Sequence, residues 1–214
     1  MPGNKYWDPV PASSSRPRQI TLRLPDRVLG LTSDSGIFSK DEIDPGTSVL
    51  LRVAPPPPLT GDILDLGCGY GPIAVTIALR SPGAVVWAVD VNQRALDLLR
   101  KNAQDCGASN CVAATPEEVP EAVRFAAIYS NPPVKIGQEA MRNLLLRWLA
   151  RLLPSAHAYL VVKKNLGADT LADWLTGQGY PTDRLRSKRG YRVLHTRSGG
   201  RAQRKSRSTG ERPL

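Results

Sequence analysis

Several features that mark whole classes of protein are missing from this sequence. No apolar run approaches the roughly 20 residues needed to span a bilayer, which excludes a transmembrane helix. Residues 1–10 contain no apolar core of a signal peptide, so we expect a protein that is not secreted. The sequence has no internal repeat, and its composition is neither collagen-like nor mucin-like.

Cysteine and histidine are scarce. The three cysteines, Cys68, Cys106 and Cys111, have no C-x-x-C spacing, and reduced thiols in a cytoplasmic protein are the simplest interpretation. The two histidines, His157 and His195, form no metal-binding or catalytic-triad pattern. We therefore expect no metal site.

Positive charge is in excess, and all of the excess lies near the C-terminus. The 214 residues are 41% hydrophobic and 22% charged, which suits one globular domain. The net charge is +10, and residues 184–214 contain eleven Lys or Arg and one acid, whereas the preceding residues hold eighteen of each sign. This distribution favours a polyanionic partner, most often nucleic acid, with residues 184–214 contacting phosphates. A solvated tail that maintains solubility is the alternative.

The chain divides into a globular region and two polar ends. Residues 1–18, rich in Pro and Ser, are expected to form a flexible arm, and residues 197–214 a basic, disordered tail. A single domain then covers residues 19–196, with a hairpin and lid over 19–58 and a core over 59–196.

Apolar strands and helical patterns alternate through the core, which is typical of a parallel sheet covered on both faces. A hairpin over residues 20–31 and an apolar helical stretch after Asp44-Pro45-Gly46-Thr47 precede them. The expected strands cover residues 63–66, 84–89, 111–113, 125–129, 159–162 and 191–194. The expected helices cover residues 72–80, 92–106, 137–153 and 169–178.

A glycine-rich loop follows the first core strand and opens a helix. It reads Asp65-Leu66-Gly67-Cys68-Gly69-Tyr70-Gly71, and the next strand ends in Asp90. Glycines let the backbone turn tightly and approach a ligand, and an acid at the next strand end can accept hydrogen bonds from both ribose hydroxyls. The combination indicates a nucleoside site, and a tight turn that binds nothing is the alternative.

The spacing within this loop favours S-adenosylmethionine over a dinucleotide. A dinucleotide site usually reads G-x-G-x-x-G because pyrophosphate sits on the helix N-terminus, whereas this loop reads G-x-G-x-G. The preceding carboxylate of Asp65 would repel a pyrophosphate and attract an ammonium or sulfonium group.

A second motif, Asn131-Pro132-Pro133, follows the strand over residues 125–129. Ligands of open α/β sheets bind beyond the carboxyl ends of strands, which puts Asn131 beside the cofactor. The Asn131 side-chain oxygen and the Pro132 carbonyl can each accept a proton from one NH₂ group and aim the nitrogen lone pair at a methyl group. Catalysis would then be mostly positioning and preorganised polarity. A Pro-rich loop with a capping Asn is the alternative.

Together these motifs resemble those of the class I S-adenosylmethionine-dependent methyltransferases. More narrowly, they resemble the "methyltransferase small" family, which includes ribosomal RNA guanine-N2 methyltransferases of the RsmC and RlmG type. The resemblance covers roughly residues 20 to 196. Its matching segments are Gly36-Ile37-Phe38-Ser39 with Asp44-Pro45-Gly46-Thr47, Asp62 to Pro72, Val91 to Ala95, Ser130 to Gly137, and Gly190 to Leu194.

The resemblance implies an α/β, Rossmann-like fold with a seven-stranded, mostly parallel sheet whose last strand is antiparallel and whose faces carry helices. It implies that residues 38–47 close over the cofactor. The implied catalytic residues are Asn131, Pro132 and Pro133, and the implied substrate contacts are Val134, Lys135 and Phe38. The implied contacts to S-adenosylmethionine come from Thr47, Asp65, Gly67, Cys68, Gly69, Gly71, Asp90, Val91, Thr115 and Asn131.

Three features depart from the family pattern. Val134 stands where relatives usually carry a large or aromatic residue that stacks on the base, so Phe38 or Lys135 would share that contact. Ala114-Thr115-Pro116 stands where an acid often faces the adenine amine, which leaves adenine recognition to backbone groups. The chain is also too short for the duplicated half of larger relatives.

These motifs and the basic C-terminal segment predict a cytoplasmic methyltransferase acting on an exocyclic amine, guanine N2 of ribosomal RNA. The expected partner is ribosomal RNA or the small ribosomal subunit, with no membrane and no metal. One alternative is methylation of the glutamine side-chain amide in protein, whose enzymes usually have Tyr after the prolines and a helical N-terminal domain. The other is a non-catalytic RNA-binding or ribosome-assembly factor, which would not need the intact glycine loop.

Overall fold

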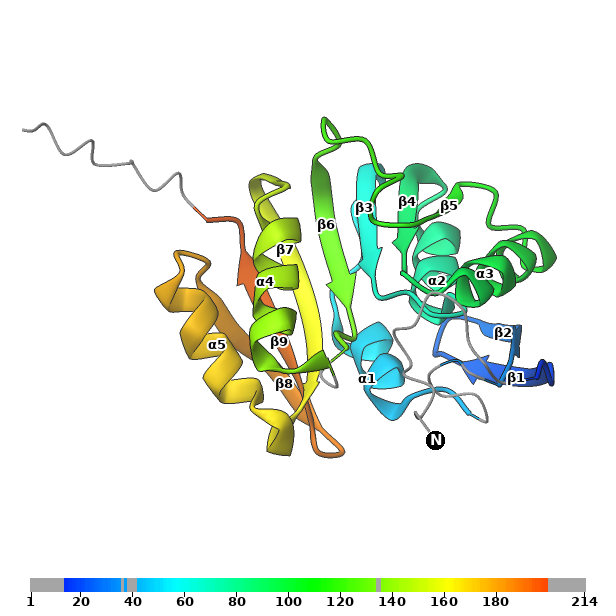
Figure 1. The fold of residues 1–214 in the computed structure, drawn as a ribbon, viewed down its shortest axis with the longest axis horizontal. Helices are drawn as coiled ribbons and strands as arrows, with labels where there is room; N and C mark the ends of the chain where they lie inside the picture. Colours follow the sequence, from blue (N-terminus) through cyan, green and yellow to red (C-terminus); the bar gives the residue numbers. More distant parts are fainter. Residues whose placement is uncertain (1–13, 36, 38–41, 134–135, 200–214) are drawn as a thin grey trace, which may run out of the picture.

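A seven-stranded sheet forms the centre of the molecule, and helices cover both of its faces (Figure 1). The computed structural model describes residues 14–35, 37, 42–133 and 136–199. Two strands, β1 (Arg18–Arg23) and β2 (Val28–Ser33), form a separate antiparallel hairpin. The sheet strands are β3 (Thr60–Leu66), β4 (Gly83–Val89), β5 (Cys111–Ala114), β6 (Phe125–Ser130), β7 (Leu152–Lys163), β8 (Thr182–Lys188) and β9 (Tyr191–Arg197). The helices are α1 (Pro45–Val53), α2 (Pro72–Arg80), α3 (Gln93–Asp105), α4 (Gln138–Leu149), the short 3₁₀ helix η2 (Lys164–Leu166) and α5 (Ala168–Gly177).

The strand order is β5-β4-β3-β6-β7-β9-β8. The five strands from β5 to β7 are parallel, while β9 is antiparallel to both β7 and β8. The predicted Rossmann-like methyltransferase fold is therefore confirmed, including the antiparallel last strand. The carboxyl ends of β3, β4, β6 and β7 meet at one edge, the lower edge in Figure 1, where open α/β sheets bind ligands.

Two apolar layers hold the sheet between its helices. On one face, α1, α2, α3 and the hairpin pack in a core that includes the fully buried Leu31, Leu50 and Leu96. On the other face, α4 and α5 pack in a core built around Trp148 and Phe125, whose ring centroids lie 6.0 Å apart. Burial of these large side chains supplies most of the driving force for folding.

The N-termini of three helices are fixed by residues that the sequence contains at the expected places. Asp44 caps α1 by accepting from the Thr47 N–H at 2.9 Å, and Asn92 caps α3 by accepting from the Ala95 N–H at 3.2 Å. Pro72 occupies the first turn of α2, where its missing N–H costs little. The predicted helix over 72–80 is confirmed.

At the other end of the sheet, two predicted elements were wrong in extent and one strand was missed. The expected helix over 137–153 is α4, which ends at Leu149, because the chain after it continues into β7 at Leu152. β7 is therefore much longer than the expected strand over 159–162. No strand was expected over 182–188, where β8 lies, because this edge strand is exposed along nearly its whole length and lacks an apolar pattern.

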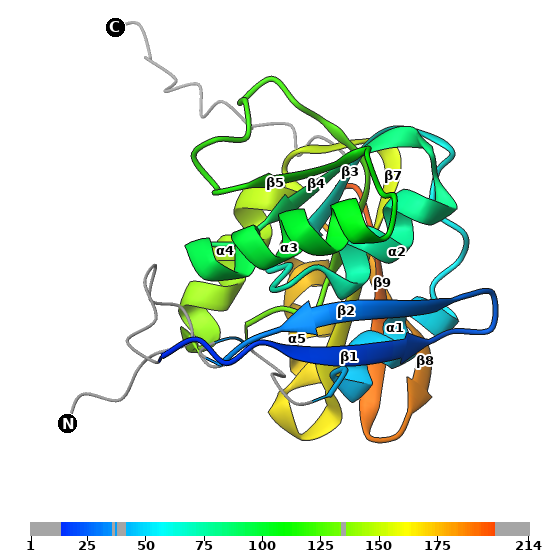
Figure 2. The same ribbon diagram turned by 90° about the vertical axis from the view of Figure 1, so that its right-hand side faces the viewer.

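The β1–β2 hairpin lies beside α3, and β2 contacts this helix (Figure 2). The Asn102 side chain of α3 accepts from the Thr32 N–H at 2.7 Å and donates to the Thr32 carbonyl at 2.9 Å and the Tyr70 carbonyl at 2.8 Å. One buried amide thus ties the hairpin to the glycine loop. No helix in the described part of the chain is long and apolar enough to cross a membrane.

Candidate active site

The glycine loop joins β3 to α2 in a conformation that needs glycine. Gly67, Gly69 and Gly71 have φ of +74°, +54° and +93°, in the left-handed region that side chains rarely adopt. A Cβ at Gly71 would also lie 2.9 Å from Leu99 Cγ. The N–H groups of Gly67 and Cys68 donate to the Val89 carbonyl at 2.8 and 3.0 Å, which fastens the loop to the end of β4.

Asp65, at the end of β3, is fully buried and only half satisfied. Its Oδ2 accepts from the Ala74 N–H at 2.9 Å, whereas its Oδ1 is buried without a hydrogen-bond partner. Burial raises the pKa of this carboxyl to about 8, with a smaller contribution from the nearby Asp90 charge. A buried carboxylate oxygen without a partner is costly, so this position favours a cationic or hydrogen-bond-donating ligand.

Asp90, at the end of β4, lies under the same loop. Its two oxygens accept from the Gly69 and Asn92 N–H groups, each at 2.9 Å, and burial raises its pKa. Each oxygen keeps a further lone pair with which it can accept from a ligand hydroxyl. The Asp90 N–H donates to the Ala114 carbonyl at 3.3 Å, which brings Thr115 to the same edge, and Val91 beside it is 44% exposed.

The Asn-Pro-Pro loop touches the glycine loop. Ser130 donates to the Leu66 carbonyl at 2.7 Å and so holds the end of β6 against the end of β3. A Cβ at Gly67 would lie 3.7 Å from Pro133 Cδ and 4.0 Å from the Asn131 carbonyl oxygen. The two motifs that are 64 residues apart in the chain therefore form one site.

The side-chain amide of Asn131 is held by α1. Its Nδ2 donates to Asp44 Oδ1 at 2.7 Å and to Thr47 Oγ1 at 3.2 Å. Asp44 is the N-cap of α1, and Thr47 is buried in its first turn. Thr47, an expected contact to the cofactor, thus lies beside Asn131. Asp44 had no assigned role; its only sequence signal is the capping pattern Asp44-Pro45-Gly46-Thr47.

Cys68 was predicted to contact the cofactor, but its side chain lies in the apolar core. It is buried in the apolar core on the α1–α3 face, and burial raises the pKa of its thiol well above the usual range. Only its backbone takes part in the loop. Phe38, Val134 and Lys135 lie outside the described residues. Within the described part of the chain, no group of three His, Cys, Asp or Glu side chains could hold a metal ion.

Glu118 was missed by sequence reasoning. Its Oε2 accepts from the Thr115 N–H at 2.7 Å, which places a carboxylate beside the end of β5 although Glu118 is four residues beyond that end. Ala114-Thr115-Pro116 carries no acid, and only the turn that follows β5 brings Glu118 there.

A sequence model of the methyltransferase small domain family matches residues 28–195. The chain belongs to this family. As a methyltransferase, it is similar to the uncharacterized protein YbxB of Bacillus subtilis, with 31% identity over 192 residues that cover 88% of this chain and 96% of that protein. It is also similar to ribosomal RNA small subunit methyltransferase C of Shewanella amazonensis, with 32% identity over 71% of this chain and 45% of that protein.

Among solved structures, the methyltransferase resembles the 16S rRNA N2-guanine methyltransferase (RsmC) of T. thermophilus, solved in complex with AdoMet and guanosine. The TM-score is 0.73 at 26% identity, and the match covers 88% of this chain and 52% of that chain. The methyltransferase therefore spans about half the length of the methyltransferase C relatives that it matches. The predicted family is confirmed.

Proposed function

We propose that this chain transfers a methyl group from S-adenosylmethionine to the exocyclic N2 amine of a guanine in ribosomal RNA. The observation that carries the proposal is the contact between Gly67 and the Asn131-Pro132-Pro133 loop. It sets a nucleoside-type loop and a pair of oriented carbonyl acceptors side by side, as transfer from a bound cofactor to a planar amine requires.

The residues present fit S-adenosylmethionine. The unpartnered Oδ1 of Asp65 suits its ammonium group, and the two spare lone pairs of Asp90 suit its ribose hydroxyls. The left-handed backbone at Gly67 and Gly69 leaves room where side chains would intrude. Gly71, Val91 and Thr115 would make further contacts to the cofactor, and Thr47 lies on the Asn131 side. When bound, the cofactor supplies the methyl group that is transferred.

Two carbonyl oxygens of the Asn-Pro-Pro loop bind and orient the amine. Within the described residues, no donor is hydrogen bonded to Asn131 Oδ1 or to the Pro132 carbonyl oxygen, whereas the Pro133 carbonyl already accepts from Ile136 at 3.1 Å. Pro132 and Pro133 fix the loop, and the two free oxygens each accept one N–H of the amine. Their hydrogen bonds draw the nitrogen lone pair out of conjugation and hold it toward the methyl donor.

The relatives support this substrate class. The Shewanella amazonensis protein is named for ribosomal RNA of the small subunit, and the T. thermophilus structure holds guanosine beside AdoMet. We transfer these properties to this chain as a proposal, with guanine as the base and the small subunit or its RNA as partner. We propose the cytoplasm as its location. Val134, Lys135 and Phe38 would contact the base, and the basic segment 184–214 the phosphates.

The deciding experiment is transfer of labelled methyl from S-adenosylmethionine to small subunits, large subunits, free ribosomal RNA, tRNA and bulk protein. All acceptors come from cells that lack this gene, so the target is unmodified. We expect label in ribosomal RNA, recovered as N2-methylguanosine. Label in glutamine of protein would overturn the RNA proposal, and failure to bind the cofactor in calorimetry would overturn catalysis altogether.

A further inference from the structure

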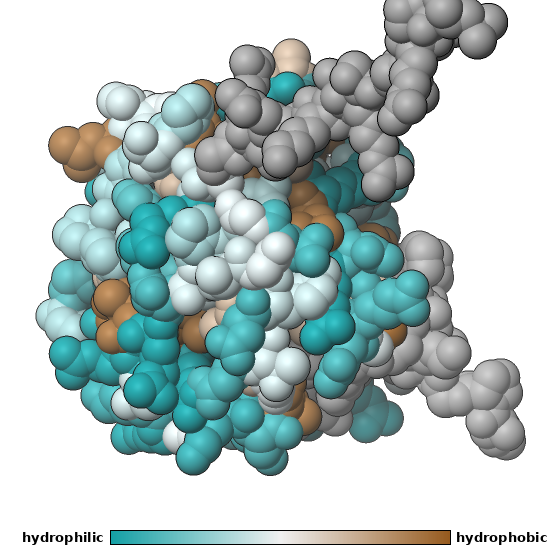
Figure 3. Space-filling view, turned by 90° about the vertical axis from the view of Figure 1, so that its left-hand side faces the viewer, coloured by the Kyte–Doolittle hydropathy of each residue, from teal (hydrophilic) through white to brown (hydrophobic). Residues whose placement is uncertain are grey.

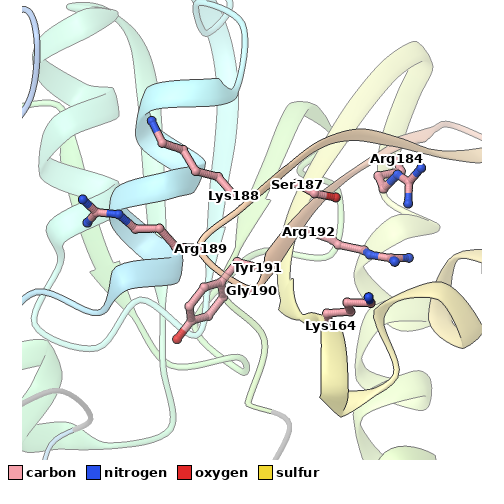
Figure 4. Close-up of a pocket in the computed structure, with 8 residues that line it drawn as sticks. All are labelled: Lys164, Arg184, Ser187, Lys188, Arg189, Gly190, Tyr191 and Arg192. Atoms are coloured by element: carbon pink, nitrogen blue, oxygen red, sulfur yellow. The ribbon is translucent and has the colours of Figure 1, made fainter.

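The β8–β9 hairpin and η2 line a cleft of about 610 Å³ at the carboxyl edge of the sheet. In Figure 4, Lys188 and Arg189 extend from the hairpin toward α1, whereas the other cations lie on the side of η2 and α5. Five of the residues that line the cleft are cationic: Lys164, Arg184, Lys188, Arg189 and Arg192.

Few carboxylates offset this charge. Among the residues that the structure describes, only Arg192 of the five has a carboxylate partner, Asp169. The sequence contains no acid from residue 184 to residue 199. Four cations of the cleft therefore have no carboxylate among the described residues that would compete with a ligand.

The cleft is joined to the candidate active site through one aromatic ring. A Cβ at Gly46 would lie 2.7 Å from Tyr191 Cε1, so the backbone of α1 rests directly on the Tyr191 ring, which lines the cleft. Gly46 lies between Asp44 and Thr47, the two residues that bind the Asn131 amide. A polymer bound in the cleft would therefore pass close to an amine held at Asn131.

We propose that this cleft binds the backbone phosphates of RNA nucleotides next to the target base. The inference rests on the proposed function and deepens it, because it assigns phosphate contact to folded residues of the sheet. Lys and Arg bind phosphates through charge and hydrogen bonds without reading sequence. An acidic protein would be expected to need apolar anchors at its interface, yet the lower part of the face in Figure 3 is mostly hydrophilic.

The test compares the full chain with the double variant Lys188→Ala/Arg189→Ala and with the control Arg186→Ala. Arg186 lies on the same hairpin but does not line the cleft. The probe is a fluorescent single-stranded RNA oligonucleotide of about 20 nucleotides, titrated by anisotropy at several salt concentrations without cofactor. We expect the double variant to bind the RNA about 10-fold more weakly than the parent. The plot of the logarithm of the association constant against the logarithm of the salt concentration should become less steep by about 1.4, because two phosphate contacts are lost.

The control should change affinity by less than about 2-fold. Equal losses in the control and the double variant would overturn the cleft as a site, and so would an unchanged salt slope in the double variant. Poly-glutamate is titrated in parallel, and cleft-dependent binding of it as tight as that of RNA would assign the cleft to an acidic protein instead. Cofactor affinity and labelled transfer, measured separately, show whether the proposed function itself has failed.

A second observation, the pairing of Asp44 with Asn131, carries a separate proposal. An ionised carboxylate only accepts hydrogen bonds, so Asp44 Oδ1 can bind the Asn131 amide only through its NH₂ group. We infer that Asp44 is a positioning residue, which fixes the amide so that Oδ1 is the atom presented to the substrate amine. Without this carboxylate only the Thr47 hydroxyl, among the described residues, would hold the amide. A hydroxyl can donate as well as accept, so the amide could rotate and present a donor, which repels the N–H groups of the amine.

Two substitutions at this position separate orientation from helix capping. Both Ser and Asn can still cap α1, because each offers a side-chain oxygen to the Thr47 N–H. Asp44→Asn also keeps an oxygen that reaches Asn131, whereas Asp44→Ser is too short to reach it. We expect Asp44→Asn to keep kcat within about 3-fold, and Asp44→Ser to lower kcat about 10- to 100-fold, with KM for RNA and the cofactor Kd unchanged.

The thermal midpoint of both variants should stay within about 2 °C of the parent, since each keeps its cap. Full activity of Asp44→Ser would overturn the positioning role. An equal loss in both variants, or a loss confined to KM, would overturn it as well, because neither result depends on the orientation of the Asn131 amide.

Discussion

At the β3–β4 end of the sheet's carboxyl edge, charge is negative and buried, whereas at the β8–β9 end it is positive and exposed. Asp65 and Asp90 sit under a glycine loop and hold most of their hydrogen bonds with backbone N–H groups. Arg184, Lys188 and Arg189 of the hairpin are exposed, whereas Arg192 is buried and paired with Asp169. The other four cations of the cleft lack a carboxylate partner among the described residues. The buried end therefore suits a small ligand bound in one orientation. The exposed end suits a polymer that can bind in more than one position.

The largest effect should come from the residue at the centre of this edge. Asn131→Ala removes one of two acceptors for the amine, and we expect kcat/KM to fall about 100-fold or more, because misplaced reactants lose most of the benefit of positioning. Cofactor affinity should stay within about 2-fold of the parent, measured by calorimetry. Transfer at the parental rate in this variant would remove the amide from the mechanism.

At the buried end, Asp65→Asn should weaken S-adenosylmethionine binding about 10- to 100-fold, since a charge-assisted hydrogen bond becomes a neutral one. The measurement is titration calorimetry at pH 7. Asn is close in shape to Asp and can still accept from the Ala74 N–H. An unchanged Kd would show that the cofactor does not use this carboxylate.

The raised pKa of Asp65 predicts the direction in which the stability of the protein changes with pH. The pKa of Asp65 is raised from 3.8 to about 8 in the folded protein, so the folded state holds this proton more tightly than the unfolded state does. The stability of the ligand-free protein should therefore fall as pH rises from about 4 to about 8 and then level off. The thermal midpoint should depend less steeply on pH in Asp65→Asn than in the parent protein. Parallel plots of midpoint against pH for the two proteins would contradict the raised pKa.

The next largest effect should come from a substitution in the glycine loop. Gly71→Ala adds a methyl group both to a left-handed residue and against Leu99, and we expect a loss of about 1–3 kcal/mol, or several degrees in the thermal midpoint. Gly107→Ala is the matched control, because Gly107 has φ of +72° but no atom near its Cβ position. Equal losses would show that the Leu99 contact contributes nothing.

The smallest effect belongs to the exposed end. Arg186→Ala, on the solvent-facing edge strand β8, should change stability by less than about 0.5 kcal/mol in chemical denaturation. A loss above 1 kcal/mol would mean that β8 is held by more than its backbone pairing with β9, and would weaken the contrast between the two ends.

The same contrast explains what could be predicted from the sequence. The loop of residues 65–71, Asp90 and Asn131 could be located because buried strands are apolar and the polar residues that follow them stand out. β8 could not be located, because an exposed edge strand has no buried face and so shows no alternation of apolar and polar residues. Asp44 and Glu118 were missed as site residues for another reason: tertiary packing brings Asp44 to Asn131, and the fold of a turn brings Glu118 to Thr115.

The basic character of β8 also bears on how the protein behaves at high concentration. As an edge strand of the sheet, β8 has one row of backbone N–H and C=O groups with no neighbouring strand in the described part of the chain. Such an edge can template pairing with another chain, and charged side chains on it are a common protection against aggregation. Arg184, Arg186 and Lys188 place like charges along this strand, so two copies that approached edge to edge would repel each other. We expect a variant that loses all three charges to self-associate, even where its fold and its cofactor site are intact.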